Sequence, residues 1–360
     1  MRATRVRLRD FRSYERAEAE LGEGLTVVLG PNGAGKTNLL EAVYFALTAR
    51  SCRTANEREV VRLGAELTRT EAEVSGEDGG HLLEVGFKPG EAKHLRIDGA
   101  PVERFGADVP RPLTVVFLPE RLELVRGGPS LRRAHLDQFA AALHPALADL
   151  RSRYARALAQ RNALVARHSV GPGILEPWDG ELARLGWELM QERTKAAQIL
   201  AEPFTRLAGE LGLPEPAELA YRPRSRAGSA EELRAELAER HGADLQRGFT
   251  AHGPHRDELL LAHGSRPLRA FGSQGQQRVG LLALLLAERE VLLDARGLSP
   301  LLLLDDVMSE LDAERRLRLA ELLRGGGQAL ITATEAEHVP GAGEAGVVTI
   351  NVEPGALVGA

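Results

Sequence analysis

The chain has 360 residues, of which 43% are hydrophobic and 27% are charged, so it can bury a sizeable core and is too apolar to be disordered. Its net charge of -5 excludes a protein that is basic all round, and contact with DNA would need a local basic patch. The single cysteine, Cys52, excludes a disulfide framework, and no apolar run reaches the roughly 20 residues that cross a bilayer. We therefore expect a soluble, cytoplasmic protein with no membrane partner.

The first elements predict a strand, a glycine-rich loop and a helix. Residues 5–8 alternate charged and apolar side chains, as a half-buried strand does, and Leu25–Leu29 is a short apolar run typical of a buried strand. Apolar residues in 38–49 recur at helical spacing. Further along, short alternating or apolar segments predict a small antiparallel meander and another buried strand: 71–74, 82–87, 95–97 and 113–118.

The middle of the chain has a helical pattern. A helix start is predicted at Pro129–Ser130, with Ser130 as the N-cap. Two stretches with heptad-like spacing, 143–164 and 178–199, predict an antiparallel helical hairpin whose turn is 169–177. Prolines are expected to break the chain from Pro203 onward, before one more short helix at 230–241.

Strands and helices alternate again after residue 248. The pattern predicts strands at 258–262, Leu301–Leu304, 329–332 and 347–352, and helices at 276–293 and 313–323. We expect an α/β head formed by residues 1–125 and 244–360, with a mostly helical lobe, 126–243, inserted between its two parts.

The loop after the first buried strand has a phosphate-binding pattern. It fits G-x-x-x-x-G-K-[ST] between a strand and a helix, and consists of Gly30, Pro31, Asn32, Gly33, Ala34, Gly35, Lys36 and Thr37. The backbone N–H groups of such a loop and the following helix N-terminus bind phosphate. We expect this loop, together with Asn38, to bind ATP, with Lys36 on the β- and γ-phosphates and the Thr37 hydroxyl on Mg²⁺.

A buried strand that ends in two acids supplies the second half of the site. Leu301–Leu304 is followed by Asp305 and Asp306. We expect Asp305 to bind the metal with Thr37, and Asp306 to polarise the attacking water. Lys36 and Asp306 are therefore the candidate catalytic residues.

A third segment, 271–277, resembles the Ser-Gly-Gly-Gln signature of ABC ATPases, with Gln274 in place of the first glycine. In that interpretation four residues face the γ-phosphate of ATP held by a partner subunit: Ser273, Gln274, Gly275 and Gln276. The alternative is an ordinary serine N-cap. Segment 309–312 resembles the D-loop of the same proteins, and its Asp312 either lies at the dimer interface or caps the next helix.

Together these motifs, with a helical lobe between two nucleotide half-sites, resemble the SMC-like branch of ABC ATPases. Within that branch the chain is similar to the RecF family of bacterial recombination mediators, in segments 8–14, 30–38, 51–54, 128–133, 253–257 and 304–312. The resemblance implies an ABC-type P-loop ATPase head with the inserted lobe, Mg²⁺-dependent binding of ATP, weak DNA-stimulated ATP hydrolysis, and a homodimer that closes when ATP bridges two heads.

The same resemblance implies a cellular role. It predicts a protein of DNA replication, DNA repair and the SOS response that binds duplex DNA and junctions between single strands and duplex. It also implies cooperation with RecR and, indirectly, with RecO and with RecA, which the protein would help to load at single-strand gaps.

Three residues depart from the pattern of fast ABC ATPases. Asp306 stands where transporter-type proteins usually have Glu, Thr334 stands in place of the switch His, and Glu120 follows the strand at 113–118 in place of a Q-loop Gln. All three indicate a slow, switch-like ATPase.

Two arginine groups are candidate DNA contacts. Arg5, Arg7 and Arg9 alternate along the first strand and either line a phosphate track or form a solvated face. Arg132 and Arg133 lie at a predicted helix start and are either a second contact or structural. No aromatic residues interleave with either group, so contact would be to the DNA backbone.

Two other classes of protein fit the same motifs. One is the ATPase subunit of an ABC transporter, against which the inserted helical lobe counts. The other is a non-hydrolysing structural protein that binds ATP only to assemble.

Overall fold

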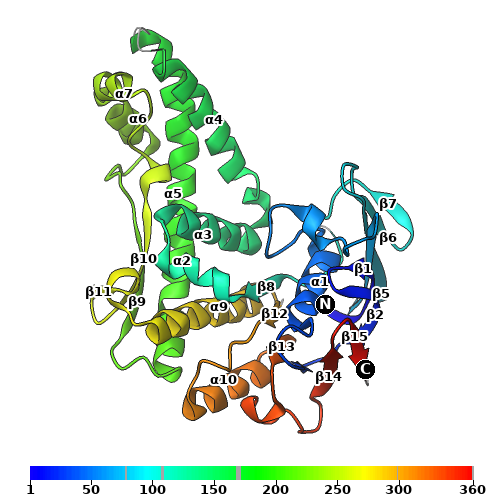
Figure 1. The fold of residues 1–360 in the computed structure, drawn as a ribbon. Helices are drawn as coiled ribbons and strands as arrows, with labels where there is room; N and C mark the ends of the chain where they lie inside the picture. Colours follow the sequence, from blue (N-terminus) through cyan, green and yellow to red (C-terminus); the bar gives the residue numbers. More distant parts are fainter. Residues whose placement is uncertain (78, 107–108, 168–171, 298, 359–360) are drawn as a thin grey trace. The chain divides into compact units, whose positions relative to one another are not determined.

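The computed structural model describes residues 1–77, 79–106, 109–167, 172–297 and 299–358 (Figure 1). These residues form two compact units. The first unit joins both ends of the chain, Met1–Arg121 and Leu292–Ala360, and the second is the intervening Leu122–Val291. None of the described helices is both long and apolar enough to span a membrane.

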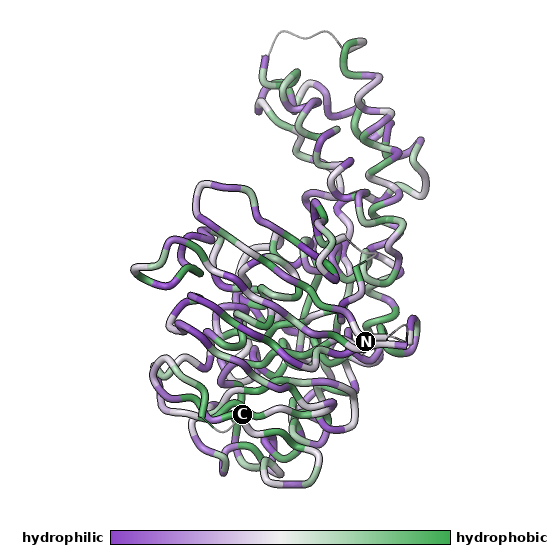
Figure 2. Tube along the Cα trace, turned by 90° about the vertical axis from the view of Figure 1, so that its right-hand side faces the viewer, coloured by the Kyte–Doolittle hydropathy of each residue, from purple (hydrophilic) through white to green (hydrophobic). Residues whose placement is uncertain are grey.

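One sheet of the first unit is antiparallel, in the order β2-β1-β4-β5-β6-β7. Its strands are β1 (Arg2–Phe11), β2 (Tyr14–Glu20), β4 (Thr68–Gly76), β5 (Gly79–Phe87), β6 (His94–Ile97) and β7 (Ala100–Val102). Buried and more exposed positions alternate along β4, and hydrophobic and hydrophilic residues are interspersed along the chain (Figure 2). In β1 the alternation buries Val6 and Leu8, and a bulge between Ala3 and Arg5 turns Ala3 inward as well. The predicted antiparallel meander is confirmed by the pairing of β4, β5 and β6.

A second sheet of the first unit has the order β15-β14-β3-β13-β12-β8 and is parallel except for β15. Its strands are β3 (Leu25–Leu29), β8 (Thr114–Phe117), β12 (Leu301–Leu304), β13 (Ala329–Ala333), β14 (Val348–Glu353) and β15 (Ala356–Val358). All four leucines of β12 are buried, as expected for an inner strand of a parallel sheet. The predicted bounds of β3 and β12 are confirmed to the residue.

Helix α1 (Lys36–Thr48) packs against both sheets of the first unit. It contacts β1, β4 and β5 on one side and β12 and β13 on the other. Leu39, Leu40 and Phe45 are fully buried, and each such side chain stabilises the unit by roughly 1.5–3 kcal/mol. The remaining helical segments of this part of the chain are η1 (Glu57–Val60), η2 (Pro119–Leu122), α10 (Ala313–Gly325) and η5 (Ala336–His338).

The second unit is mostly helical. Its segments are α2 (Glu123–Arg126), α3 (Pro129–Leu143), η3 (Pro145–Leu147), α4 (Leu150–Val165), α5 (Pro172–Glu210), α6 (Ala230–Glu239), α7 (His241–Arg247), η4 (Pro254–Arg256), α8 (Leu268–Phe271) and α9 (Gln274–Arg296), whose last residues belong to the first unit. Leu182 and Leu185 of α5 pack with Tyr154 of α4 and Leu233 of α6 in one apolar cluster. A small antiparallel sheet joins β9 (Ala217–Arg222), β10 (Glu258–His263) and β11 (Arg266–Pro267).

A buried ionic cluster lies beside that apolar core. Arg161 of α4 is fully buried at a heptad position, and its guanidinium donates to Asp179 at 2.7 Å and to Asp244 at 2.8 Å. The Thr250 hydroxyl accepts a third bond from Arg161 at 2.6 Å, and His241 Nε2 lies 2.5 Å from the other Asp179 oxygen. The cluster therefore ties α4, α5 and α7 to the segment before η4.

Several predicted boundaries in the helical region were wrong. Gly128, not Ser130, is the N-cap of α3, because Pro129 takes the first helical position, where its missing N–H costs nothing. The first predicted hairpin arm is interrupted after α3, since Pro145 cannot continue a helix. The predicted turn lies partly outside the described residues, and from Pro172 onward the chain is already helical.

Helix α5 also continues through Pro203, where the sequence pattern predicted a break. Phe204 and Leu207, just past this proline, are buried, and α5 contacts β9. Burial of the last turns offsets the lost backbone hydrogen bond. The second unit likewise extends past residue 243, the predicted end of the lobe, because β10 pairs with β9.

Candidate functional site

The predicted phosphate-binding loop connects β3 to α1 and depends on its glycines. Gly33 and Gly35 have φ angles of 82° and 119°, a region that favours glycine. A Cβ on Gly30 would lie 2.3 Å from the Val352 carbonyl oxygen, and one on Gly35 would lie 2.9 Å from the Tyr14 hydroxyl. The loop conformation thus excludes side chains at these positions.

Lys36 lies at the start of α1, with its ammonium group turned back over the loop. Its Nζ donates to the carbonyl oxygens of Gly30 at 2.7 Å and Pro31 at 3.0 Å. Desolvation lowers the pKa of Lys36, and the charges of Asp306 and Asp305 act against that shift. A cation is therefore held at the loop, beside two carboxylates.

Asp305 links the phosphate-binding loop to the rest of the sheet. The Thr37 hydroxyl donates to its Oδ2 at 2.8 Å, and the Thr332 hydroxyl donates to its Oδ1 at 2.8 Å. Asp305 is only 6% exposed, and burial raises its pKa, while the two hydroxyl donors act in the opposite direction. Because β13 lies between β3 and β12, Thr332 of β13 stands between the loop and the acid.

Thr332 contacts the second acid as well. Its Oγ1 accepts a hydrogen bond from the backbone N–H of Asp306 at 2.9 Å. Asp306 has a φ of 48°, which is unusual for a residue with a side chain, and its carbonyl oxygen accepts a bond from the Ser309 hydroxyl at 3.0 Å. Thr332 is fully buried and thus fixes both acids at once. Sequence reasoning missed this residue.

The residues at this edge of the sheet fit a magnesium ion. Hydroxyl and carboxylate oxygens, here from Thr37 and Asp305, are the ligands that Mg²⁺ prefers. In the part of the chain that is described, no group of three or more His, Cys, Asp or Glu side chains converges on a metal position. A magnesium ion here would therefore also need water and phosphate oxygens, as is usual for this ion.

A polar network supports the first turn of α1. Asn38 donates to the Ser13 hydroxyl at 3.0 Å and accepts from Arg53 at 3.0 Å. One turn later Glu41, which is fully buried, receives two bonds from Arg12, at 2.8 and 2.9 Å. The segments around residues 12 and 53 therefore fix the helix that begins at Lys36.

The predicted signature segment lies in the second unit and forms a capping box. The Ser273 hydroxyl accepts from the Gln276 backbone at 3.2 Å, and the Gln276 side chain accepts from the Ser273 backbone at 2.8 Å. The N-cap interpretation is thus confirmed for Ser273. Ser273 and Gln274 are nevertheless exposed, and a Cβ on Gly275 would meet open space, so this helix end is accessible.

Asp312 likewise caps a helix. Its Oδ1 accepts from the Arg315 backbone at 2.9 Å at the start of α10. The cap interpretation of Asp312 is therefore confirmed, and its side chain remains 58% exposed.

The predicted arginine track on β1 is neutralised by neighbouring strands. Arg5 lies 2.6 Å from Glu20, and Arg7 lies 2.7 Å from Glu73 and 3.3 Å from Glu18. Arg9 lies 3.9 Å from Asp10 and is 62% exposed. A phosphate on this face would have to displace carboxylates from Arg5 and Arg7, which counts against the predicted track.

Arg132 is buried and Arg133 is half-buried, and both make internal bonds, which favours the structural alternative over the predicted DNA contact. Arg132 is 3% exposed and makes two bonds to Glu258, at 2.8 and 2.9 Å, so its donors point into the unit. Arg133 donates to the Asp257 carbonyl oxygen at 2.6 Å, and burial lowers its pKa. Residues at a helix start can turn inward, and the sequence alone did not show that these do.

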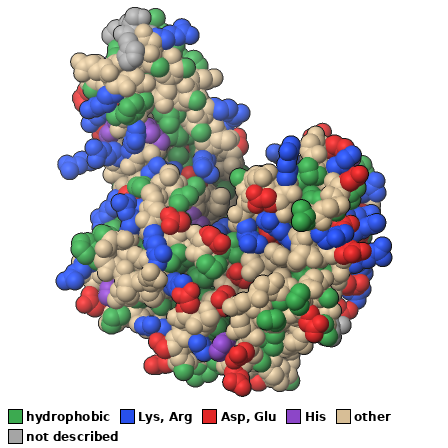
Figure 3. All heavy atoms as spheres, viewed as in Figure 1, with side chains coloured by type: hydrophobic (Ala, Val, Ile, Leu, Met, Phe, Trp, Pro, Cys, Tyr) green, Lys and Arg blue, Asp and Glu red, His purple; other side chains and the backbone are tan. Residues whose placement is uncertain are grey.

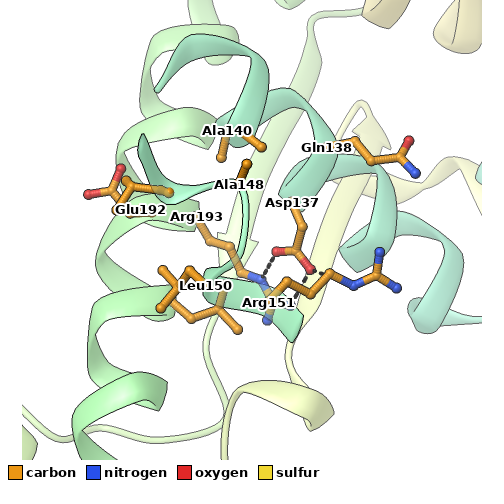
Figure 4. A pocket seen from close by; sticks show the side chains of 11 residues that line it. Asp137, Gln138, Ala140, Ala148, Leu150, Arg151, Glu192 and Arg193 are labelled. Carbon is orange, nitrogen blue, oxygen red and sulfur yellow. Dashed lines mark hydrogen bonds and ion pairs between the residues drawn. The ribbon is translucent and has the colours of Figure 1, made fainter. Parts of the chain in front are cut away.

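A small pocket within the second unit offers few free polar groups. It lies between α3, η3, α4 and α5, and Asp137 and Arg193 line it with Arg151 and Leu150 (Figure 4). Arg193 donates to Asp137 at 2.7 and 3.0 Å, and Arg151 lies 3.5 Å from the same carboxylate. Asp137, Arg193 and Arg151 therefore pair with one another, and Glu192, which also lines the pocket, pairs with Lys195.

Comparison with known proteins agrees with this geometry. The family model for the RecF/RecN/SMC N terminal domain matches residues 3–355. The DNA replication and repair protein RecF of Streptomyces avermitilis is 42% identical over 95% of both chains. RecF of an Anaeromyxobacter species is 40% identical, also over 95% of both, and RecF of Frankia alni is 38% identical over 94% of this chain and 95% of that one.

Solved structures give the same assignment. The structure of the recombination mediator protein RecF with ATP, in the RecFOR pathway, matches with a TM-score of 0.85 at 28% identity, over 99% of this chain and 98% of that one. An Smc head bound to the C-terminal winged-helix domain of ScpA matches with a TM-score of 0.61 at 14% identity, over 99% and 96%, and shows the fold alone. The chain therefore belongs to the RecF family of DNA replication and repair proteins.

Proposed function

We propose that this chain is an ATP-dependent DNA-binding protein of recombinational repair, in which ATP joins two copies and slow hydrolysis releases them. The observation that carries the proposal is the direct bond from Thr37 in the phosphate-binding loop to Asp305 at the end of β12. This bond joins the two halves of a nucleotide site in a RecF-family chain.

Each residue of the site has a proposed role. The loop from Gly30 to Asn38 holds the phosphates of ATP, and Lys36 transfers its bonds from the loop carbonyls to phosphate oxygens. Thr37 and Asp305 would hold Mg²⁺, which would supply positive charge to offset that of the phosphates. Asp306 orients the attacking water. Its carboxylate is one methylene shorter than Glu, and we expect slow turnover as a result.

The proposed dimer depends on α9, the helix that begins at the signature segment 271–277. Its exposed N-terminus at Ser273, with Gln274, Gly275 and Gln276, would contact the γ-phosphate of ATP in a second copy. In this proposal residues 1–125 and 244–360 act together as the ATPase head and 126–243 as an inserted lobe, a functional division that differs from the compact units, of which the second runs from Leu122 to Val291. The dimer binds duplex DNA and its junctions with single strands, and its partners are RecR and, indirectly, RecO and RecA in the cytoplasm, during gap repair and the SOS response.

Ser273→Arg tests the assembly directly. We expect this variant to bind ATP as the wild type does and to remain monomeric, because the new side chain would obstruct the partner's nucleotide. Sedimentation with ADP and with ATP, beside nucleotide binding to the monomer, measures both properties. Ser152→Arg, at an exposed serine on α4, is the matched control and should still dimerise. A Ser273→Arg protein that dimerises normally would contradict the proposed interface.

Lys36→Arg tests the loop. The planar guanidinium cannot reproduce the bonds of a compact ammonium group inside the loop. We expect ATP-dependent dimerisation to weaken by on the order of tenfold, a loss of about 1.4 kcal/mol. The control Lys195→Arg changes an exposed lysine paired with Glu192 and should leave ATP-dependent dimerisation unchanged. An unchanged dimer population at saturating ATP would argue against phosphate contact by Lys36. Phosphate release by the wild type separates this proposal from a protein that binds ATP without hydrolysing it.

A further inference from the structure

We propose that an arginine face on the second unit, formed by Arg224, Arg226 and Arg256, binds the phosphate backbone of DNA. The inference rests on the proposed function, which requires DNA binding, and assigns the contact to a surface that sequence patterns did not indicate. The three residues lie on two loops, one after β9 and one that includes η4.

Two carboxylates bring these loops together. The side chain of Asp257 accepts from the backbone N–H of Arg224 at 2.6 Å, which places Arg224 beside the residue that follows Arg256. Glu236 of α6 accepts from the backbone N–H of Arg226 at 3.4 Å and lies 2.5 Å from His252 Nε2. These bonds fix the first loop through its backbone N–H groups, not through its guanidinium groups.

The two acids that hold the first loop, Asp257 and Glu236, are bound by other side chains as well. Asp257 is 1% exposed, receives the Tyr221 hydroxyl and lies 3.7 Å from Arg193. The Glu236 carboxylate accepts a hydrogen bond from the Ser225 hydroxyl and also contacts His252 Nε2. All three arginines of the face are exposed, and none has an ion-pair partner among the residues that the structure describes.

Arg256 is also held in place. Its guanidinium lies over the Phe249 ring, 5.2 Å from the centroid, and Phe249 is itself 41% exposed. Restriction of a long side chain before binding reduces the entropy lost on contact. Arg133, bound to the Asp257 carbonyl oxygen, adds positive charge behind the face.

The contrast with β1 favours this surface. On the first unit the basic side chains of β1 interleave with acidic ones, whereas basic side chains project from the second unit over the segment between β9 and α6, at the left in the view (Figure 3). Exposed Glu231, Glu232 and Glu239 of α6 limit the face to the two loops, and Glu232 accepts from the backbone N–H of Gly228 at the end of the first loop. Guanidinium groups on loops contact phosphates, so we expect little sequence preference.

The test is the salt dependence of binding to a 30-base-pair duplex. The variant Arg224→Gln/Arg226→Gln/Arg256→Gln should bind at least about tenfold more weakly, and its slope of log affinity against log salt should fall by about 0.9 per lost contact. The control Arg16→Gln/Arg58→Gln/Arg104→Gln removes the same charge from exposed arginines of the first unit that have no ion pair with any residue in the described ranges, and it should keep the wild-type slope. Unchanged ATP-dependent dimerisation shows that the variant is folded.

Three results would overturn the proposal. An equal slope for the variant and the wild type excludes the arginine face, and an equal loss in the control shows that only net charge matters. If the variant binds polyglutamate more weakly than the wild type but binds DNA equally well, the arginine face binds an acidic protein and not DNA. A wild type that binds no duplex even at low salt would instead contradict the proposed function itself.

Discussion

Thr332→Val is expected to lower the rate of ATP turnover by about 10- to 100-fold, the usual effect of removing a residue that orients a metal ligand. Valine keeps the shape of the buried side chain but removes the donor to Asp305 and the acceptor for the Asp306 backbone. Both acids would then lose the group that fixes them, and the left-handed conformation of Asp306 would lose a constraint.

The separation of kcat from KM distinguishes this role from a merely structural one. We expect kcat to fall while KM for ATP changes little, because the phosphate-binding loop does not depend on Thr332 for its conformation. Thr332→Ser retains the hydroxyl and should restore most of the turnover. If valine and serine variants turn over ATP equally well, the hydroxyl does not position the acids.

Arg161→Met is expected to destabilise the second unit by about 3–5 kcal/mol, the cost of leaving buried charges without their partner. Asp179 and Asp244 are 1% and 0% exposed, and both depend on this guanidinium. The methionine fills similar space, so the loss reflects charge rather than volume. The midpoint of urea unfolding, followed in the whole chain, measures the effect.

Arg184→Met is the matched control on α5. Arg184 pairs with Glu181 at 2.8 Å, but the two side chains are 50% and 46% exposed. Exposed pairs of this kind contribute about 0–1 kcal/mol. Similar unfolding midpoints for the two variants would show that the buried cluster does not hold the helices together.

The sequence predicted the nucleotide half-sites well because their constraints are local. A glycine loop between a strand and a helix, and a leucine run ending in acids, define their own geometry, and β3 and β12 have the predicted bounds. Strand order is a tertiary property. The contact between Thr332 and Asp305 therefore cannot be predicted until β13 is known to lie between β3 and β12.

The errors have physical causes as well. Pro203 looked like a break, but the buried Phe204 and Leu207 keep α5 helical beyond it. β9 was missed because its alternation is brief: Ala217 and Leu219 are buried on either side of the exposed Glu218, but the rest of the strand is only partly buried or exposed. Arg5 and Arg7 looked available because the glutamates that pair with them lie on other strands. In all three cases, contacts between residues far apart in the sequence decide the local structure.

The strand pairing of the first unit also sets the order in which the chain can fold as it leaves the ribosome. β3 pairs with β13 on one side and β14 on the other, and the Ala3 backbone bonds to Gln328. The second unit is one continuous stretch and is complete once Val291 has been made. β3, the strand that leads into the phosphate-binding loop, cannot complete its pairing until residues 348–353 have been synthesised. A chain released before that point would therefore carry a complete helical unit and no nucleotide site.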